Sequence, residues 1–140
     1  MDTNYVAILV ASIAQFIFGA IWYMPVFGKM WGQIHGFDQV APEQQAEMRK
    51  GMMPLLVVQF VFTVLTSSVF ACLYASFNSD WSIYQLAFLF WLGFLLPTQV
   101  AAVIFGGTKP GWVIKKIVIM AGASLINMEI IALVMTWLAK

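Results

Sequence analysis

Four apolar stretches, each long enough to cross a bilayer, constrain the fold of this chain more than any other feature of its sequence. They cover about residues 5–24, 54–77, 82–105 and 112–138 of the 140. A transmembrane helix needs about 20 consecutive apolar residues, and no stretch has the period-two alternation of a barrel strand. The sequence therefore predicts an all-α fold, a four-helix transmembrane bundle that forms a single integral membrane domain over residues 1–140.

The composition agrees with a chain whose main partner is the lipid bilayer. Hydrophobic residues make up 62% and charged residues 9%, and the mean hydropathy is +0.88. A soluble domain typically carries about 25% charged residues. The net charge of +1 leaves no basic face, so nucleic acid is excluded as a partner.

The first connection, residues 25–53, holds most of the loop charge. Within residues 41–50, Pro42 and Glu43 come early and Arg49 and Lys50 come late, which suits both ends of a helix dipole. We expect a short amphipathic surface helix in this first loop, and we expect Pro54 in the first turn of the second span.

Basic residues and aromatic residues indicate how the helices sit in the membrane. Six of the seven Lys and Arg residues lie in or beside the first and third connections: Lys29, Arg49, Lys50, Lys109, Lys115 and Lys116. The positive-inside rule then predicts a multi-pass protein of the cell inner membrane, with the first and third loops cytoplasmic and both termini outside. Amphipathic rings at the membrane exits predict interfacial anchors at Trp22, Tyr23, Trp31 and Trp112.

Polar side chains inside hydrocarbon require partners, so those in the spans are informative about contacts. Ser12, Gln15 and Gly19 lie on one stripe of the first helix, which should face protein. The predicted intramembrane polar site consists of Gln15, Gln59, Thr63, Gln99, Asn127 and Glu129. These groups either join helices by hydrogen bonds or line a polar cavity.

The third span contains a predicted helix kink at Gly93 and Pro97. Proline has no N–H and crowds the carbonyl four residues earlier, so the Gly93 carbonyl should be freed. A freed carbonyl beside Gln99 is either a contact point for a ligand or a feature that only shapes packing.

Glu129 is the one formal charge deep in a span, and no Lys or Arg lies at a similar depth. Asn127 lies about 200° around the same helix, so the two side chains cannot face one partner. We therefore expect one of them to lie at a subunit contact, in a homo-oligomer or against another membrane protein.

Few residues suggest catalysis or metal binding. His35 stands alone in the first loop and Cys72 is the single cysteine, so no metal site is predicted. Because no nucleophile lies beside a base and no phosphate-binding loop is present, we predict no catalytic residues and no cofactor. An enzyme is the less favoured class.

Residues 19–31, GAIWYMPVFGKMW, resemble the signature of a bacterial family of small membrane proteins known as domain of unknown function 1761. Trp91-Leu92-Gly93-Phe94, Pro97 and Phe105-Gly106-Gly107 are similar to the third helix of that family. The resemblance implies a four-helix membrane protein of uncharacterised function. Two functions stay open: a self-associating structural or accessory membrane subunit, and a small transporter or channel with an intramembrane polar site that includes Glu129.

Overall fold

The computed structural model describes residues 4–77 and 80–138, and in that part of the chain it contains helices and no strands. The α-helices are α1 (Tyr5–Ile21), α2 (Gly28–Ile34), α3 (Pro42–Ser76), α4 (Ile83–Phe90), α5 (Leu96–Phe105) and α6 (Val113–Leu138). Short π-helical segments follow α1 and α4, namely η1 (Trp22–Val26) and η3 (Trp91–Leu95), and 3-10 turns lie at η2 (Phe37–Gln39) and η4 (Pro110–Trp112).

Four continuous helical segments are long and apolar enough to cross a membrane: Tyr5–Val26, Pro42–Ser76, Ile83–Phe105 and Pro110–Leu138. The predicted all-α fold with four spanning helices is confirmed, and the chain is a multi-pass membrane protein.

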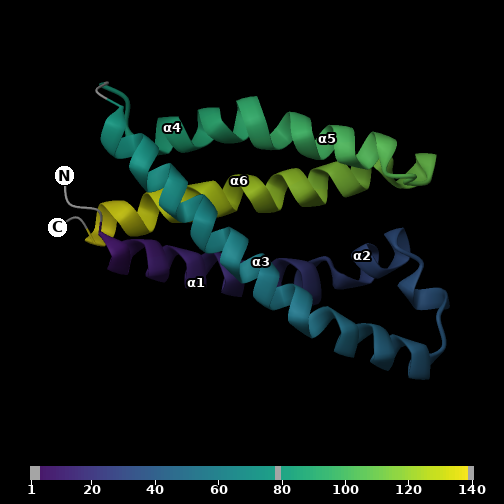
Figure 1. The fold of residues 1–140 in the computed structure, drawn as a ribbon. Coiled ribbons are helices and arrows are strands. Elements are labelled where there is room, and N and C mark those ends of the chain that lie inside the picture. Colours follow the sequence, from purple (N-terminus) through teal and green to yellow (C-terminus); the bar gives the residue numbers. More distant parts are fainter. Residues whose placement is uncertain (1–3, 78–79, 139–140) are drawn as a thin grey trace.

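The helices form a layer that α3 crosses. In that layer α6 lies between α1 on one side and the α4–α5 pair on the other (Figure 1). α3 runs obliquely over α1 and reaches α4 with its C-terminal half (Figure 1). The ends of α1 and α6 meet, where Asn4 Nδ2 donates a hydrogen bond to the Leu138 carbonyl at 3.2 Å. The first and third loops therefore lie together at the opposite end of the bundle.

The first loop differs from the sequence-based expectation in two ways. Residues 42–50 are helical as expected, but they are the first turns of the 35-residue α3, and Pro54 lies inside that helix. Between Pro42 and Pro54 the chain is rich in strong helix formers, and Pro54 removes a single backbone hydrogen bond, so the helix continues through it. α2 was not expected; it forms directly after η1.

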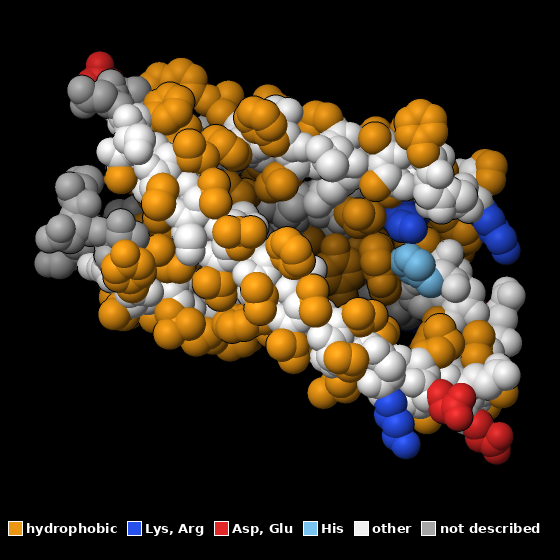
Figure 2. Space-filling model, in the orientation of Figure 1, with side chains coloured by type: hydrophobic (Ala, Val, Ile, Leu, Met, Phe, Trp, Pro, Cys, Tyr) orange, Lys and Arg blue, Asp and Glu red, His pale blue; other side chains and the backbone are white. Residues whose placement is uncertain are grey.

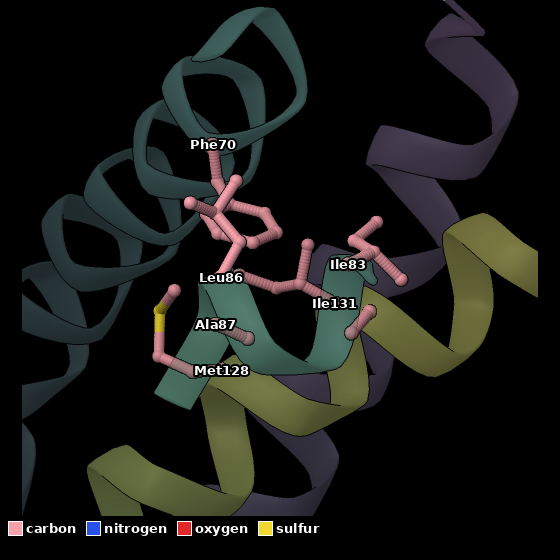
Figure 3. Packing of buried hydrophobic residues seen from close by; sticks show 7 residues of the cluster. Phe70, Ile83, Leu86, Ala87, Met128 and Ile131 are labelled. Carbon is pink, nitrogen blue, oxygen red and sulfur yellow. The ribbon is translucent and has the colours of Figure 1, made fainter. Parts of the chain in front are cut away.

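The core joins α3, α4 and α6 through a cluster of apolar residues. Phe70 of α3 packs against Leu86 of α4 and Ile131 of α6 (Figure 3), and Ala87 and Ala132 of the same cluster are fully buried. Lipid tails are as apolar as leucine, so helix association here depends on close packing, which small residues permit. Ala11 serves the same purpose on α1, where it is also fully buried.

Candidate functional site

A closed polar cluster joins α1 to α3. Ser67 Oγ accepts hydrogen bonds from Gln15 Nε2 at 2.8 Å and from Ser12 Oγ at 3.2 Å. The same side chains also lie within hydrogen-bond distance of carbonyls of their own helices, Ser67 Oγ at 3.1 Å from Thr63 O, so Ser12 shares its one hydroxyl proton between Ser67 and the Ile8 carbonyl. Ser12 and Ser67 are fully buried and Gln15 is 5% exposed. Because these groups bond to one another, the cluster acts as an interhelical join.

A second polar cluster joins α5 and η3 to α6. The Trp91 indole N–H lies 3.0 Å from both the Ala121 carbonyl and Ser124 Oγ. Ser124 Oγ in turn lies 3.0 Å from Gln99 Oε1, to which it can donate. Gln15 and Gln99, grouped by the sequence into one site, thus belong to two separate networks.

Two tryptophans bind the backbone of α6 in the same manner. Trp22 Nε1 donates to the Ile119 carbonyl at 3.0 Å, two residues before the carbonyl that Trp91 contacts. Each tryptophan is the first residue of a π-helical segment, and a proline lies in or just after that segment, Pro25 in one case and Pro97 in the other. Such segments occur often at functional positions of helices.

The two residues of the predicted kink lie in and just after the second of these segments. Gly93 is its middle residue and Pro97 follows two residues after its end. The change from α- to π-helical geometry is therefore placed where proline removes a backbone donor.

The four residues expected to anchor the protein at the interface divide into two groups. Trp22 is half-buried with its N–H bonded inside the bundle, beside Gly122 of α6. Tyr23 stacks edge-on against Trp31, with ring centroids 4.8 Å apart, and the Lys115 ammonium lies 4.7 Å from the centre of the Trp112 ring. The last three residues thus gather near the loop end of the bundle.

The remaining predicted polar residues do not converge. Gln59 is exposed on α3, and the Thr63 hydroxyl donates to the Gln59 carbonyl of its own helix at 2.9 Å. Asn127 Oδ1 is buried without a hydrogen-bond partner. Glu129 is half-buried and makes no hydrogen bond or ion pair within residues 4–77 and 80–138.

Sequence reasoning missed the roles of Ser124 and Trp91. Ser124 follows the small residues Ala121, Gly122 and Ala123, a composition typical of close helix contacts in membranes. Trp91 lies four residues after the fully buried Ala87, so helical spacing places both on one face. Both signals were present in the sequence.

In the described part of the chain, no group of three His, Cys, Asp or Glu side chains is arranged to hold a metal ion. The chemistry that the geometry of these residues offers is hydrogen bonding inside the bundle, together with the Glu129 carboxyl and the buried Asn127 Oδ1, for which the described residues provide no hydrogen-bond partner.

Comparison with known proteins places the chain in a family. No curated protein and no solved structure matches the sequence. Residues 6–136, which include all four spans apart from their outermost turns, match the model of one protein family. The chain belongs to the family described as protein of unknown function (DUF1761).

Proposed function

We propose that this protein is a structural or accessory membrane subunit that self-associates through one face of α6, centred on Glu129. The observation that carries the proposal is the Glu129 carboxyl, which lies deep in a span with no partner in the described part of its own chain. We further propose that the first and third loops are cytoplasmic in the inner membrane, because they hold most of the basic residues.

The depth of Glu129 makes contact with lipid unfavourable. It lies 16 residues after Val113 and nine before Leu138, or about 24 Å and about 14 Å along α6. A glutamate side chain is too short to reach the headgroups from there. Charged residues at the centre of a membrane helix cost roughly 2.5–3.5 kcal/mol on insertion scales, so a covering partner is favoured.

The face of α6 around Glu129 is partly open: Gly122, about 20° away around the helix, meets Trp22, but residues on either side of it are exposed. Val118 and Leu133 lie within about 40° of Glu129 around the helix and are 62% and 58% exposed. By contrast, Met128 and Ile131 are buried against α3 and α4. A two-fold symmetric contact would place this face against the same face of a second copy, with the Glu129 carboxyls and Thr136 hydroxyls close to one another.

The polar clusters of the bundle favour this function over a transport pathway. The side chains of Ser12, Gln15 and Ser67 bond to one another, as do those of Trp91, Gln99 and Ser124. The first cluster joins α1 to α3, whereas the second joins η3 and α5 to α6, so the two share no residue. Polar groups that hold helices together in this way are typical of membrane proteins without requiring a water-filled path.

A small transporter or channel is the second candidate, and Asn127 is the observation that favours it. Its buried Oδ1 lacks a partner on the side of α6 opposite Glu129. Gln59 lies 11 residues before Phe70, hence within about 20° of it, on the side of α3 that turns toward α4 and α6. A polar path would pass between these two amides.

Substitutions at Glu129 test both candidates. Glu129→Gln keeps the shape and most hydrogen-bonding capacity, whereas Glu129→Leu removes the polar group. We expect the oligomer, measured by native mass spectrometry and by cross-linking in membranes, to survive Glu129→Gln and to dissociate in Glu129→Leu. Thr98→Leu on α5 is the matched control, because Thr98 is also a polar residue of a span and is exposed, and it should leave the oligomer intact.

The two candidates give different results. If both Glu129 variants assemble like the wild type, the proposed interface is wrong. If Glu129→Gln assembles normally but abolishes proton-dependent flux in reconstituted vesicles, the transport candidate is the correct one.

A further inference from the structure

A polar pocket of about 250 Å³ lies at the loop end of the bundle, between the end of α2 and the connection from α5 to α6. Its polar lining comes from Gln33, His35, Gln39, Thr108, Lys109 and Lys116. Neither of the polar clusters described above contributes to it. The first and third loops, which hold most of the basic residues, thus form one site.

Glycine turns shape both walls of this pocket. Gly36 and Gly107 have φ angles of 69° and 72°, in the left-handed region that favours glycine. Gly106 has no room for a side chain either, because a Cβ there would collide with the Ala102 carbonyl oxygen. The two loops are therefore held in defined conformations around the pocket.

The lysines of the pocket have no acidic partner. Within residues 4–77 and 80–138, neither Lys109 nor Lys116 makes an ion pair with a carboxylate, and the nearby Asp38 is exposed. Lys116 Nζ lies 3.4 Å from Thr108 Oγ1 and 6.0 Å from the centre of the Trp31 ring. The ammonium group is thus held beside the aromatic residues of the membrane exit.

The helix dipoles do not cancel this positive charge. α2 and α5 direct their C-terminal ends toward the pocket, which corresponds to about −0.5 charge each, and the start of α6 contributes about +0.5. Two full lysine charges outweigh that sum. Lysines in the first turn of a helix are also placed against the dipole, so a bound anion would relieve their repulsion.

The space beside the pocket suits hydrocarbon tails. Figure 2 shows the surface hollowed between α3 and the α5–α6 pair, with hydrophobic side chains in its floor and histidine and basic side chains at one end. The first half of α3, which borders this hollow, carries exposed apolar residues, among them Leu55 and Leu56, which are 62% and 40% exposed. A basic pocket at one end of an apolar hollow matches the two parts of a phospholipid.

We infer that this pocket binds the phosphate of an anionic phospholipid, with Lys109 and Lys116 as charge partners, Thr108 and His35 as hydrogen-bonding groups, and the acyl chains along the hollow beside α3. Basic pockets between membrane helices are known to recognise acidic lipid headgroups. The inference does not depend on the oligomer proposed above.

Native mass spectrometry of the full chain in an uncharged maltoside detergent tests this inference. Dioleoylphosphatidylglycerol and dioleoylphosphatidylcholine are added at equal concentrations, and the bound lipid is counted. The wild type should retain phosphatidylglycerol in preference to phosphatidylcholine. Lys109→Gln and Lys116→Gln should each bind phosphatidylglycerol about five-fold more weakly. Lys116→Arg, which keeps the charge, should retain the preference.

Lys115→Gln is the matched control, because it removes the same charge from the neighbouring residue, whose side chain lies over Trp112 and not in the pocket. It should bind the lipid like the wild type. Equal retention of the two lipids, or an equal loss in Lys115→Gln and Lys116→Gln, would overturn the inference. A melting-temperature measurement on delipidated protein gives a further test. If inorganic phosphate raises the melting temperature as much as phosphatidylglycerol does, the pocket takes a free anion and the inference is wrong.

Discussion

The Ser67 hydroxyl connects α1 and α3 within the bundle, and its removal should destabilise the protein by a predictable amount. Ser67→Ala deletes the acceptor of two interhelical hydrogen bonds, from Gln15 Nε2 and Ser12 Oγ. Neither donor becomes an orphan, because Gln15 Nε2 still reaches the Ala11 carbonyl at 3.1 Å and Ser12 Oγ the Ile8 carbonyl at 2.7 Å. Because Ser12 has one hydroxyl proton, which lies closer to the Ile8 carbonyl, the loss is that of the bond from Gln15 and of a shared, weaker bond from Ser12, without an added desolvation penalty.

The magnitude follows from interhelical bonds measured in membranes, which average about 0.6 kcal/mol each. Ser67→Ala should thus lower the free energy of unfolding by about 0.6–1.2 kcal/mol, the lower value if the Ser12 proton stays on the Ile8 carbonyl. Thr66→Val is the matched control: the Thr66 hydroxyl is exposed and donates within its own helix, to the Phe62 carbonyl at 2.9 Å. Its removal should change the free energy by only a few tenths of a kcal/mol.

Reversible unfolding in mixed micelles of a maltoside and dodecyl sulfate, followed by circular dichroism, measures both changes. A double-mutant cycle of Ser67→Ala with Gln15→Met should also give a coupling energy of about 0.6 kcal/mol. The reasoning fails if Ser67→Ala costs no more than Thr66→Val, or if the cycle shows no coupling between the two positions.

Two further predictions concern packing and topology. A Cβ on Gly122 would lie 3.1 Å from Trp22 Cζ2, whereas one on Gly51 of α3 meets nothing within 4 Å. Gly122→Ala should therefore be about 1–3 kcal/mol less stable than Gly51→Ala in the same unfolding assay. Replacing Trp22 by Phe should remove most of that difference, and a difference that persists in the Phe variant would show that the Trp22 ring is not the obstacle. In a Cys72→Ala background, a membrane-impermeant maleimide added outside intact cells should label Asp80→Cys and not Glu43→Cys, and the opposite pattern would reverse the proposed orientation.

The four spans were predictable because length and apolar composition are local properties of the sequence. Where a helix ends is less local. Pro54 carries a strong signal for a first helical turn, yet α3 continues through it, because a proline in a long helix removes one hydrogen bond and the remaining turns hold the helix together. At about 52 Å, α3 is also longer than the roughly 30 Å hydrocarbon core. Sequence composition alone therefore divided this one helix into a span and a separate surface helix.

The polar residues show a different limit of sequence reasoning. Six of them were grouped because each is polar and lies in a span, but a span has several faces. Gln15 bonds to Ser67 of α3, Gln99 to Ser124 of α6, and Glu129 makes no hydrogen bond or ion pair in the described part of the chain. Helical spacing predicts which residues share a face of one helix, whereas the neighbour of that face is set by how all the helices pack.

Trp22 shows that the position of a residue around its helix can decide its environment where the residue type does not. Its indole ring, apolar with one polar edge, fits both the headgroup region and a carbonyl inside a bundle, so the residue type alone does not decide between them. The position does: Trp22 lies seven residues after Gln15, about 20° away around the helix, and so continues the buried stripe of α1. The π-helical segment that begins at Trp22 then alters the direction of the residues after it, and Tyr23 and Trp31 pack together at the loop end. A tryptophan on a buried stripe should therefore be assigned to a neighbouring helix, and one outside such a stripe to the membrane interface.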